Sequence, residues 1–301
     1  MILLKVVSDH LKESGVSQNK DVVVTGVSSG IGLATVRVLI AKGFRVFGSV
    51  RKQADASRLQ MQFGKSFEPL LMDVTDSDAV YRAAREVGSM VGDGNLAGLV
   101  NNAGIVISGP LLYQRPNEFR RQLETNLIAP FVVTQAFAPL LGTDKARGGP
   151  RGRVVMISST SAKVALPFLG AYTASKAGLE GMSDSLRREL MLFGIDLIII
   201  EPGAVSTAMY DKGESEDLSE FQRTAYWDAL TRFQSFLVAE GRKGLAPEIL
   251  GDAVHMALTI AKPKARYALV PQRFKNWTMP RLLPSRIQDN GLAKQLGFGT
   301  N

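Results

Sequence analysis

The feature that most constrains the fold is a glycine-rich turn between a short apolar run and a helical pattern. Residues 21–43 read DVVVTGVSSGIGLATVRVLIAKG, with glycines at 26, 30 and 32 and with apolar residues at helical spacing up to Gly43. A strand, a glycine-rich turn and a helix together aim backbone N–H groups at a phosphate. The glycine spacing alone is a weak signal, but here it stands in the context that phosphate binding requires.

Apolar runs and helical patterns continue to alternate up to about residue 270. We expect six more strands, in 44–50, 67–73, 96–104, 153–159, 195–203 and 265–270, and helices over 77–87, 117–141, 171–193 and 247–261. Pro130 and Pro139 are expected to bend or shorten the helix over 117–141. This alternation predicts an α/β fold, a single Rossmann-type doubly wound parallel sheet flanked by helices.

Ligands of such folds bind outside the carboxyl ends of the strands, which predicts one active site at that edge of the sheet. The second strand ends in Val50 and is followed by Arg51, with no carboxylate at its tip. An acidic residue there would bind the ribose hydroxyls of NAD, whereas a basic one suits the extra phosphate of NADP. The alternative is that Arg51 is merely an exposed arginine. The residues at predicted strand ends or turns are Gly30, Arg51, Asp73, Asn102, Ser159 and Pro202.

Tyr172 and Lys176 lie four residues apart in the predicted helix over 171–193, so their side chains share one helix face. A nearby cation brings the pKa of a tyrosine, ordinarily about 10, toward neutral pH. Ser159 stands at the end of the apolar run RVVMISS, where its hydroxyl could bind a carbonyl oxygen. The Tyr–Lys spacing is weak by itself, because helix surfaces carry many such pairs by chance.

Composition excludes several kinds of chemistry. The chain has no cysteine and only two histidines, His10 and His255, so we expect no metal site, disulfide or cysteine nucleophile. The net charge of +8 is spread along the chain without a dense basic run, which predicts a solvated basic surface and no nucleic-acid partner. The opening MILLKVV is too short for a signal peptide or a membrane span, and we expect a soluble, cytoplasmic protein with no integral membrane segment.

We expect one catalytic domain over 1–301, with an N-terminal extension over 1–20 and a C-terminal tail over 272–301. Residues 204–245 interrupt the alternation and are rich in aromatic side chains, which allows a lid over the ligand cleft. The alternative for the part after 218 is a helix pair packed on its own apolar stripe. The proposed lid begins with Ala208 and Met209, and the insert's aromatic residues are Tyr210, Phe221, Tyr226, Trp227, Phe233 and Phe236.

From residue 20 to 272 the sequence resembles the short-chain dehydrogenase/reductase family. The matching motifs are TGVSSGIG at 25–32, NNAG at 101–104, Asn126, Ser159, Tyr172-x-x-x-Lys176, and Pro202-Gly203 followed by Thr207. These motifs in the right order form a specific match, and Arg51 resembles the NADP-preferring branch. That branch's basic residue within the glycine loop is missing, since Ser29 stands there. The tail segment RLLPSRIQDNGLAKQLGF is similar to the ends of members that act on steroids, retinoids and other lipophilic alcohols.

The resemblance implies hydride transfer between NADP(H) and a carbonyl or alcohol, with Asn126, Ser159, Tyr172 and Lys176 as a catalytic tetrad. Ser159 would stabilise charge on the substrate oxygen, and Tyr172 would supply the proton. Lys176 would hold the nicotinamide ribose and lower the pKa of Tyr172, and Asn126 would connect Lys176 to solvent through a water. Thr207 would bond the carboxamide of the nicotinamide. The implied cofactor-binding positions are Gly26, Ser28, Ser29, Gly30, Ile31, Gly32, Arg51, Asp73, Val74, Asn102, Ala103, Gly104, Tyr172, Lys176, Pro202, Gly203 and Thr207.

The resemblance also implies a homodimer or homotetramer. A bulky lipophilic ketone or secondary alcohol is the expected substrate, because methionine and aromatic side chains in 204–245 suit an apolar ligand. Packing of these side chains into the core or an oligomer contact is the alternative. Two other functions stay open, a non-catalytic NADP-binding sensor on the same fold and an epimerase or dehydratase that uses the cofactor without net turnover. The sequence does not identify the individual substrate or the direction of the reaction.

Overall fold

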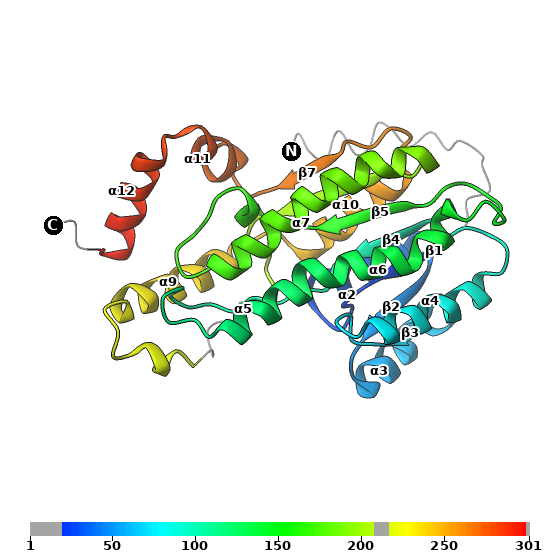
Figure 1. Cartoon of the computed structure of the whole chain (residues 1–301), viewed down its shortest axis with the longest axis horizontal. Coiled ribbons are helices and arrows are strands. Elements are labelled where there is room, and N and C mark those ends of the chain that lie inside the picture. The colour runs from blue at the N-terminus through cyan, green and yellow to red at the C-terminus, as the bar shows by residue number, and fades with distance from the viewer. Residues whose placement is uncertain (1–19, 208–216, 299–301) are drawn as a thin grey trace.

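Seven short runs of the chain pair into one parallel sheet (Figure 1). The structure is a computed structural model that describes residues 20–207 and 217–298. The strand order is β3-β2-β1-β4-β5-β6-β7, which reverses between β1 and β4 as in doubly wound folds. The predicted fold class is therefore confirmed. The strands are β1 Asp21–Val24, β2 Arg45–Val50, β3 Phe67–Leu71, β4 Gly98–Asn101, β5 Arg153–Ile157, β6 Leu197–Pro202 and β7 Arg266–Leu269.

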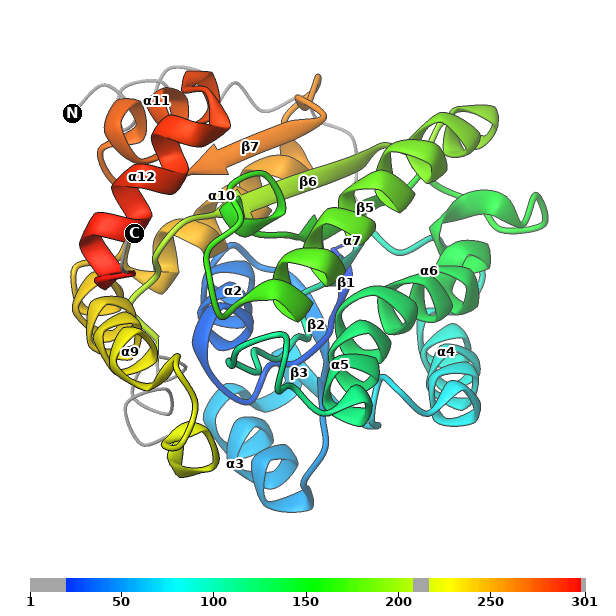
Figure 2. The same ribbon diagram turned by 60° about the vertical axis from the view of Figure 1, so that its left-hand side comes forward.

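Helices cover both faces of the sheet (Figure 2). On one face lie α2 (Gly30–Ala41), α3 (Gln53–Phe63) and α10 (Pro247–Thr259), and on the other α4 (Ser77–Val91), α5 (Pro116–Leu123), α6 (Ala129–Ala138) and α7 (Gly170–Glu189). Side chains of successive strand residues point to opposite faces of the sheet. Val23 therefore packs under α4 and α6, while Val22 and Val24 pack under α2 and α10. Apolar side chains on both faces of each strand explain the continuous apolar runs of the sequence.

The two prolines do not end the long helix, which runs from α5 through a π turn, Glu124–Ile128, into α6. It is kinked after Pro139, because Gly142 in the second π turn, Pro139–Thr143, has non-helical angles (φ 112°, ψ 18°). Pro130 has no N–H to donate to the carbonyl four residues earlier, and a π turn accommodates that loss. By length and composition this helix could cross a membrane, but more than half of its apolar window is buried in the protein. Its apolar residues thus form part of the core, with α4 and α7 as neighbours.

Three local features of the structure were not predicted from the sequence. The sequence QADASRLQMQF was not expected to be helical, but it forms α3, which buries only Ala56 and Leu59. Strand β3 ends at Leu71, so Asp73 lies in the turn that follows rather than in the strand. The tail contains a π turn (Phe274–Thr278) and two helices, α11 (Met279–Leu282) and α12 (Ser285–Leu296).

The predicted insert over 204–245 is closed at its base, because Val205 and Leu245 form a β-bridge. Its main element is α9 (Trp227–Arg242), which packs with α12 and the segment before α7 in a third apolar cluster. Phe168 is the centre of this cluster and contacts Tyr226, Phe233 and Phe298 edge-on or tilted, with ring centroids 5.4–6.1 Å apart. The described aromatic side chains of the insert therefore pack against α12 and the segment before α7. Ala208, Met209, Tyr210 and the N-terminal extension up to residue 19 lie outside the described residues.

Candidate active site

A cavity of about 1420 Å³ opens at the carboxyl ends of the strands and extends from the glycine-rich turn to the C-terminal helices. Small-molecule pockets usually measure about 300–1,000 Å³, so this cavity has room for a dinucleotide and a substrate together. Every predicted site residue except Asn126 lines it. The convergence expected from the strand ends is thus what the fold produces.

Two glycines of the turn are required by its shape. Gly26 has a φ of +70°, a conformation that side chains with a Cβ rarely adopt. A Cβ at Gly32 would lie 2.2 Å from the Gly26 carbonyl oxygen and 2.5 Å from Asn102 Nδ2. The turn is therefore too tightly packed for any larger residue at position 32.

Asn102 holds this turn from the neighbouring strand. Its Nδ2 donates to the carbonyl oxygens of Thr25 (2.8 Å) and Gly26 (3.1 Å), and the backbone N–H groups of Asn102 and Ala103 donate to Thr25 Oγ1. Asn102, predicted as a cofactor-binding residue, therefore also fixes the conformation of the turn.

The start of α2 fits a phosphate group. Its N-cap residue, Ser29, makes no side-chain cap hydrogen bond, and the first turn of the helix carries no acidic residue. The first backbone N–H groups of a helix have no partner within the helix and carry partial positive charge. An anion such as the pyrophosphate of a dinucleotide satisfies both features.

The end of β2 presents basic side chains to the same turn. Arg51 is exposed and lines the cavity, and its charge, with that of Arg121, acts on Asp73. Partial burial would raise the pKa of the Asp73 carboxyl, but hydrogen bonds from Thr75 and these two charges lower it below its ordinary value. Asp73 is therefore an anion at neutral pH.

Arg58 on α3 was missed by the sequence reasoning. Its Nη2 donates to the carbonyl oxygen of Ser28 and to Asp55 Oδ1, at 2.9 Å each. It thus brings a guanidinium from a neighbouring helix to the glycine loop, which has no basic residue of its own. No sequence motif marks Arg58, because its placement depends on how α3 packs beside the turn.

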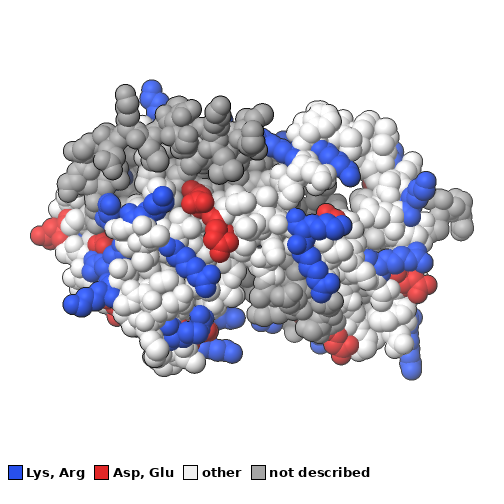
Figure 3. Space-filling view, turned by 180° about the vertical axis from the view of Figure 1, so that it is seen from behind, with Lys and Arg blue, Asp and Glu red and all other residues white. Residues whose placement is uncertain are grey.

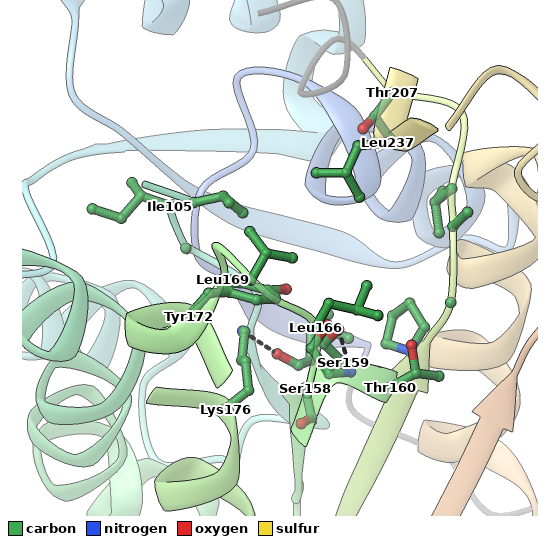
Figure 4. Close-up of a pocket in the computed structure, with 18 of the residues that line it drawn as sticks. Ile105, Ser158, Ser159, Thr160, Leu166, Leu169, Tyr172, Lys176, Thr207 and Leu237 are labelled. Atoms are coloured by element: carbon green, nitrogen blue, oxygen red, sulfur yellow. Dashed lines mark hydrogen bonds between the residues drawn. The ribbon is translucent and has the colours of Figure 1, made fainter. Parts of the chain in front are cut away.

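Tyr172, Lys176 and Ser159 line the opposite wall (Figure 4). Lys176 Nζ donates to the carbonyl oxygen of Ile157 (2.8 Å) and lies 5.9 Å from the centroid of the Tyr172 ring. Burial lowers the pKa of Lys176 to about 8, although the charge of Glu180 acts in the opposite direction. The expected meeting of phenol and ammonium on one helix face is therefore present, with the ammonium the dominant form below pH 8 or so.

Ser159 follows β5 and begins a 3-10 turn, Thr160–Ala162, whose Ser161 N–H donates to Ser159 Oγ (3.1 Å). The hydroxyl hydrogen of Ser159 thus remains available for an acceptor in the cavity. Leu166 and Leu169 lie beside it, so the polar wall is narrow and borders apolar surface (Figure 4).

Asn126 lies behind this wall, in the first π turn of the long helix. Its Oδ1 accepts from the Ile105 N–H (2.9 Å), and its Nδ2 donates to the Ile105 carbonyl (2.9 Å) and to Ser175 Oγ (3.1 Å). A Cβ added to Gly104 would lie 3.3 Å from Asn126 Oδ1 and 3.7 Å from Lys176 Nζ, so the three residues are close neighbours. The side chain of Asn126 therefore fixes the loop beside Lys176.

Comparisons with known proteins agree with this arrangement. The family described as short chain dehydrogenase matches residues 20–217. The chain belongs to the short-chain dehydrogenase family. It is 37% identical to an NADPH-dependent 3-dehydrocapnine reductase of Ornithobacterium rhinotracheale over 274 residues, which cover 91% of this chain and 96% of that protein. It is 34% identical to retinol dehydrogenase 7 of Rattus norvegicus, with 83% of this chain and 80% of that protein covered.

A solved short-chain dehydrogenase from Streptomyces avermitilis has the same fold, with a TM-score of 0.73, 25% identity, and coverage of 95% of this chain and 99% of that one. As a member of this family, the chain is an oxidoreductase. Beyond the family motifs, the cavity has an apolar part. The sequence predicted an apolar ligand site only from the side chains of residues 204–245. Its lining residues come from the loop after β4, the segment before α7, α9, and the C-terminal helices, and include Ile105, Val106, Leu166, Leu169, Leu230, Phe233, Leu237, Met279, Leu283, Ile287 and Leu292.

Proposed function

We propose that this short-chain dehydrogenase transfers a hydride between NADP(H) and a lipophilic ketone or secondary alcohol. The observation that carries the proposal is one cavity with two parts. A glycine-rich phosphate turn forms one end, and the wall of Ser159, Tyr172 and Lys176 lies next to apolar side chains at the other. The whole chain would act as one catalytic domain.

The preference for NADP(H) over NAD(H) is supported by the charges around the end of β2. Arg51 is exposed there, no carboxylate stands at Val50, and Arg58 reaches the Ser28 carbonyl from α3. A 2′-phosphate placed between two guanidinium groups would gain charge-assisted hydrogen bonds. The name of the reductase from Ornithobacterium rhinotracheale states NADPH dependence for that relative.

The side chains have distinct roles in this proposal. The cofactor, when bound, supplies or accepts the hydride. Ser159 donates a hydrogen bond to the substrate oxygen, on which negative charge develops as a carbonyl is reduced. Tyr172 gives that oxygen its proton, and the Lys176 ammonium lowers the pKa of the phenol and holds the nicotinamide ribose. Asn126 keeps the loop at Ile105 in place beside them. Through a water, it would connect Lys176 to solvent.

The substrate class is supported by the apolar part of the cavity. The third apolar cluster, from Phe168, α9 and α12, forms its outer wall. In this proposal the described residues of the insert act as a lid that packs against α12 and the segment before α7. A ligand with apolar bulk would bury surface there, whereas a polyhydroxylated one would leave its hydroxyl groups without partners. The relatives include a protein named retinol dehydrogenase.

We also propose which partners, which oligomeric state and which location this enzyme has. Lys and Arg lie scattered among Asp and Glu over the face shown in Figure 3, without merging into one basic patch, so we propose no nucleic-acid partner. Ile128 and Phe131 on the long helix are about 40% exposed, which supports a homodimer or homotetramer with these side chains at a contact. We also propose a cytoplasmic location.

The proposal is tested with a matched series of ketones of rising apolar size at fixed NADPH, followed by the absorbance of the nicotinamide. The specificity constant should rise by up to about 0.8 kcal/mol, or roughly fourfold, for each buried methylene until the cavity is full. A flat or falling trend would reject the lipophilic substrate. Tight NADPH binding without oxidation by any carbonyl compound would instead support the non-catalytic sensor.

A further inference from the structure

A buried carboxylate lies one helix turn beyond Lys176. Glu180 on α7 is 1% exposed, and all its partners are ionic or hydroxyl groups. Its Oε1 accepts from Ser158 Oγ (2.8 Å), and its Oε2 accepts from Lys163 Nζ (2.9 Å) and Arg266 Nη1 (2.6 Å). Two cations and one hydroxyl therefore surround this buried carboxylate.

These partners belong to the segments that carry the proposed active site. Ser158 precedes Ser159, and Lys163 follows the 3-10 turn that Ser159 begins. Arg266 on β7 also donates to Glu201 Oε1 (2.9 Å), and Glu201 precedes Pro202 at the end of β6. One ion cluster therefore ties together α7, the turn after β5, β6 and β7.

Glu180 also acts on Lys176 directly. Burial alone would favour the neutral amine of Lys176, and the negative charge of Glu180 opposes this and raises the pKa of the ammonium. Residues four apart on a helix have neighbouring Cβ atoms, so this charge lies within about one turn of Lys176.

We propose that Glu180 is a positioning residue whose negative charge keeps the Tyr172–Lys176 pair protonated in its buried surroundings. This inference rests on the proposed roles of Tyr172 and Lys176. The other charged groups around the pair and its carboxylate are Asp184 on α7, Lys163 after β5, Glu201 on β6 and Arg266 on β7.

The sign of the effect follows from electrostatics. Carbonyl reduction needs a protonated pair, so its rate falls as pH rises through the apparent pKa of the pair. In Glu180→Gln a negative charge is lost, which favours release of a proton from either Tyr172 or Lys176. We expect the falling limb of kcat/KM to move to lower pH by roughly one unit, the low end of the shift that a neighbouring charge produces.

Two further variants separate charge from structure. Glu180→Asp retains the carboxylate and should return the limb toward its wild-type position. Lys163→Gln removes a partner of Glu180 and leaves the carboxylate, so the limb should stay in place. Should Glu180→Gln fail to fold, Glu180→Gln with Lys163→Gln restores the charge balance of the cluster and should show the same downward shift.

A second readout does not depend on turnover. The absorbance of the Tyr172 phenolate, taken as the difference between each variant and its Tyr172→Phe counterpart, should titrate at lower pH in Glu180→Gln than in the wild type. Absence of turnover with every carbonyl compound would count against the proposed function and leave this titration intact. An unchanged titration in folded Glu180→Gln, or an equal shift in Lys163→Gln, would overturn the role of Glu180.

Discussion

Removal of the Arg51 guanidinium tests the choice of cofactor. Arg51 follows β2 and is exposed, so its hydrogen bond to a 2′-phosphate would compete with water. A hydrogen bond to a charged group contributes about 1.5–3 kcal/mol, and exposure favours the lower end of that range. We therefore expect Arg51→Ala to raise the Kd of NADPH roughly tenfold. The Kd of NADH should not change, because that cofactor has no 2′-phosphate.

Titration of both cofactors into purified protein measures these changes. Arg58 lies at the same turn but is already bonded to Asp55 and Ser28, so Arg51→Ala with Arg58→Ala should weaken NADPH binding further and still leave NADH binding unchanged. Arg82→Ala, an exposed arginine on α4, serves as the matched control with no effect on either cofactor. Equal affinity of the wild type for NADPH and NADH, or equal weakening of both in Arg51→Ala, would refute the reasoning.

Three further changes test other parts of the site. Gly32→Ala should abolish cofactor binding, because the new Cβ would meet the Gly26 carbonyl oxygen at 2.2 Å, whereas Gly181→Ala, with open space around its Cβ, should bind normally in the same titration. Lys176→Met should lower both cofactor affinity and turnover, and intact NADPH binding would contradict its role at the ribose. Phe168→Ala should raise the KM for a large ketone while the Kd of NADPH stays constant, because the Phe168 ring joins α9 to the C-terminal segment. A similar rise in the KM for the ketone and in the Kd of NADPH would contradict a lid-specific role.

The central part of the fold could be predicted because the inner strands of the sheet bury both of their faces. Val22, Val23 and Val24 are fully buried, so an apolar run marks such a strand directly. Helix α3 buries only Ala56 and Leu59, and its polar sequence therefore has no clear apolar stripe. The effect of Pro130 also could not be read from the sequence, because a π turn preserves the helix around it.

The site was predictable where motifs coincide with strand ends and not where it depends on packing between distant elements. Tyr172 and Lys176 share a helix face whatever the rest of the chain does, so their spacing sufficed. Arg58 reaches the glycine loop only because α3 packs beside it, and Glu180 meets Arg266 across 86 positions of sequence. Such contacts follow from the tertiary structure and leave no local pattern.

The most direct test of the account is the loss of the Tyr172 hydroxyl. Wild type and Tyr172→Phe, each loaded with NADPH, are mixed rapidly with excess apolar ketone, and the absorbance of the reduced nicotinamide is followed through a single turnover. Loss of a general acid should slow hydride transfer by about 10²–10⁴-fold, while the Kd of NADPH stays within about twofold of the wild type. A Tyr172→Phe enzyme that turns over at a rate close to the wild type would contradict the central claim.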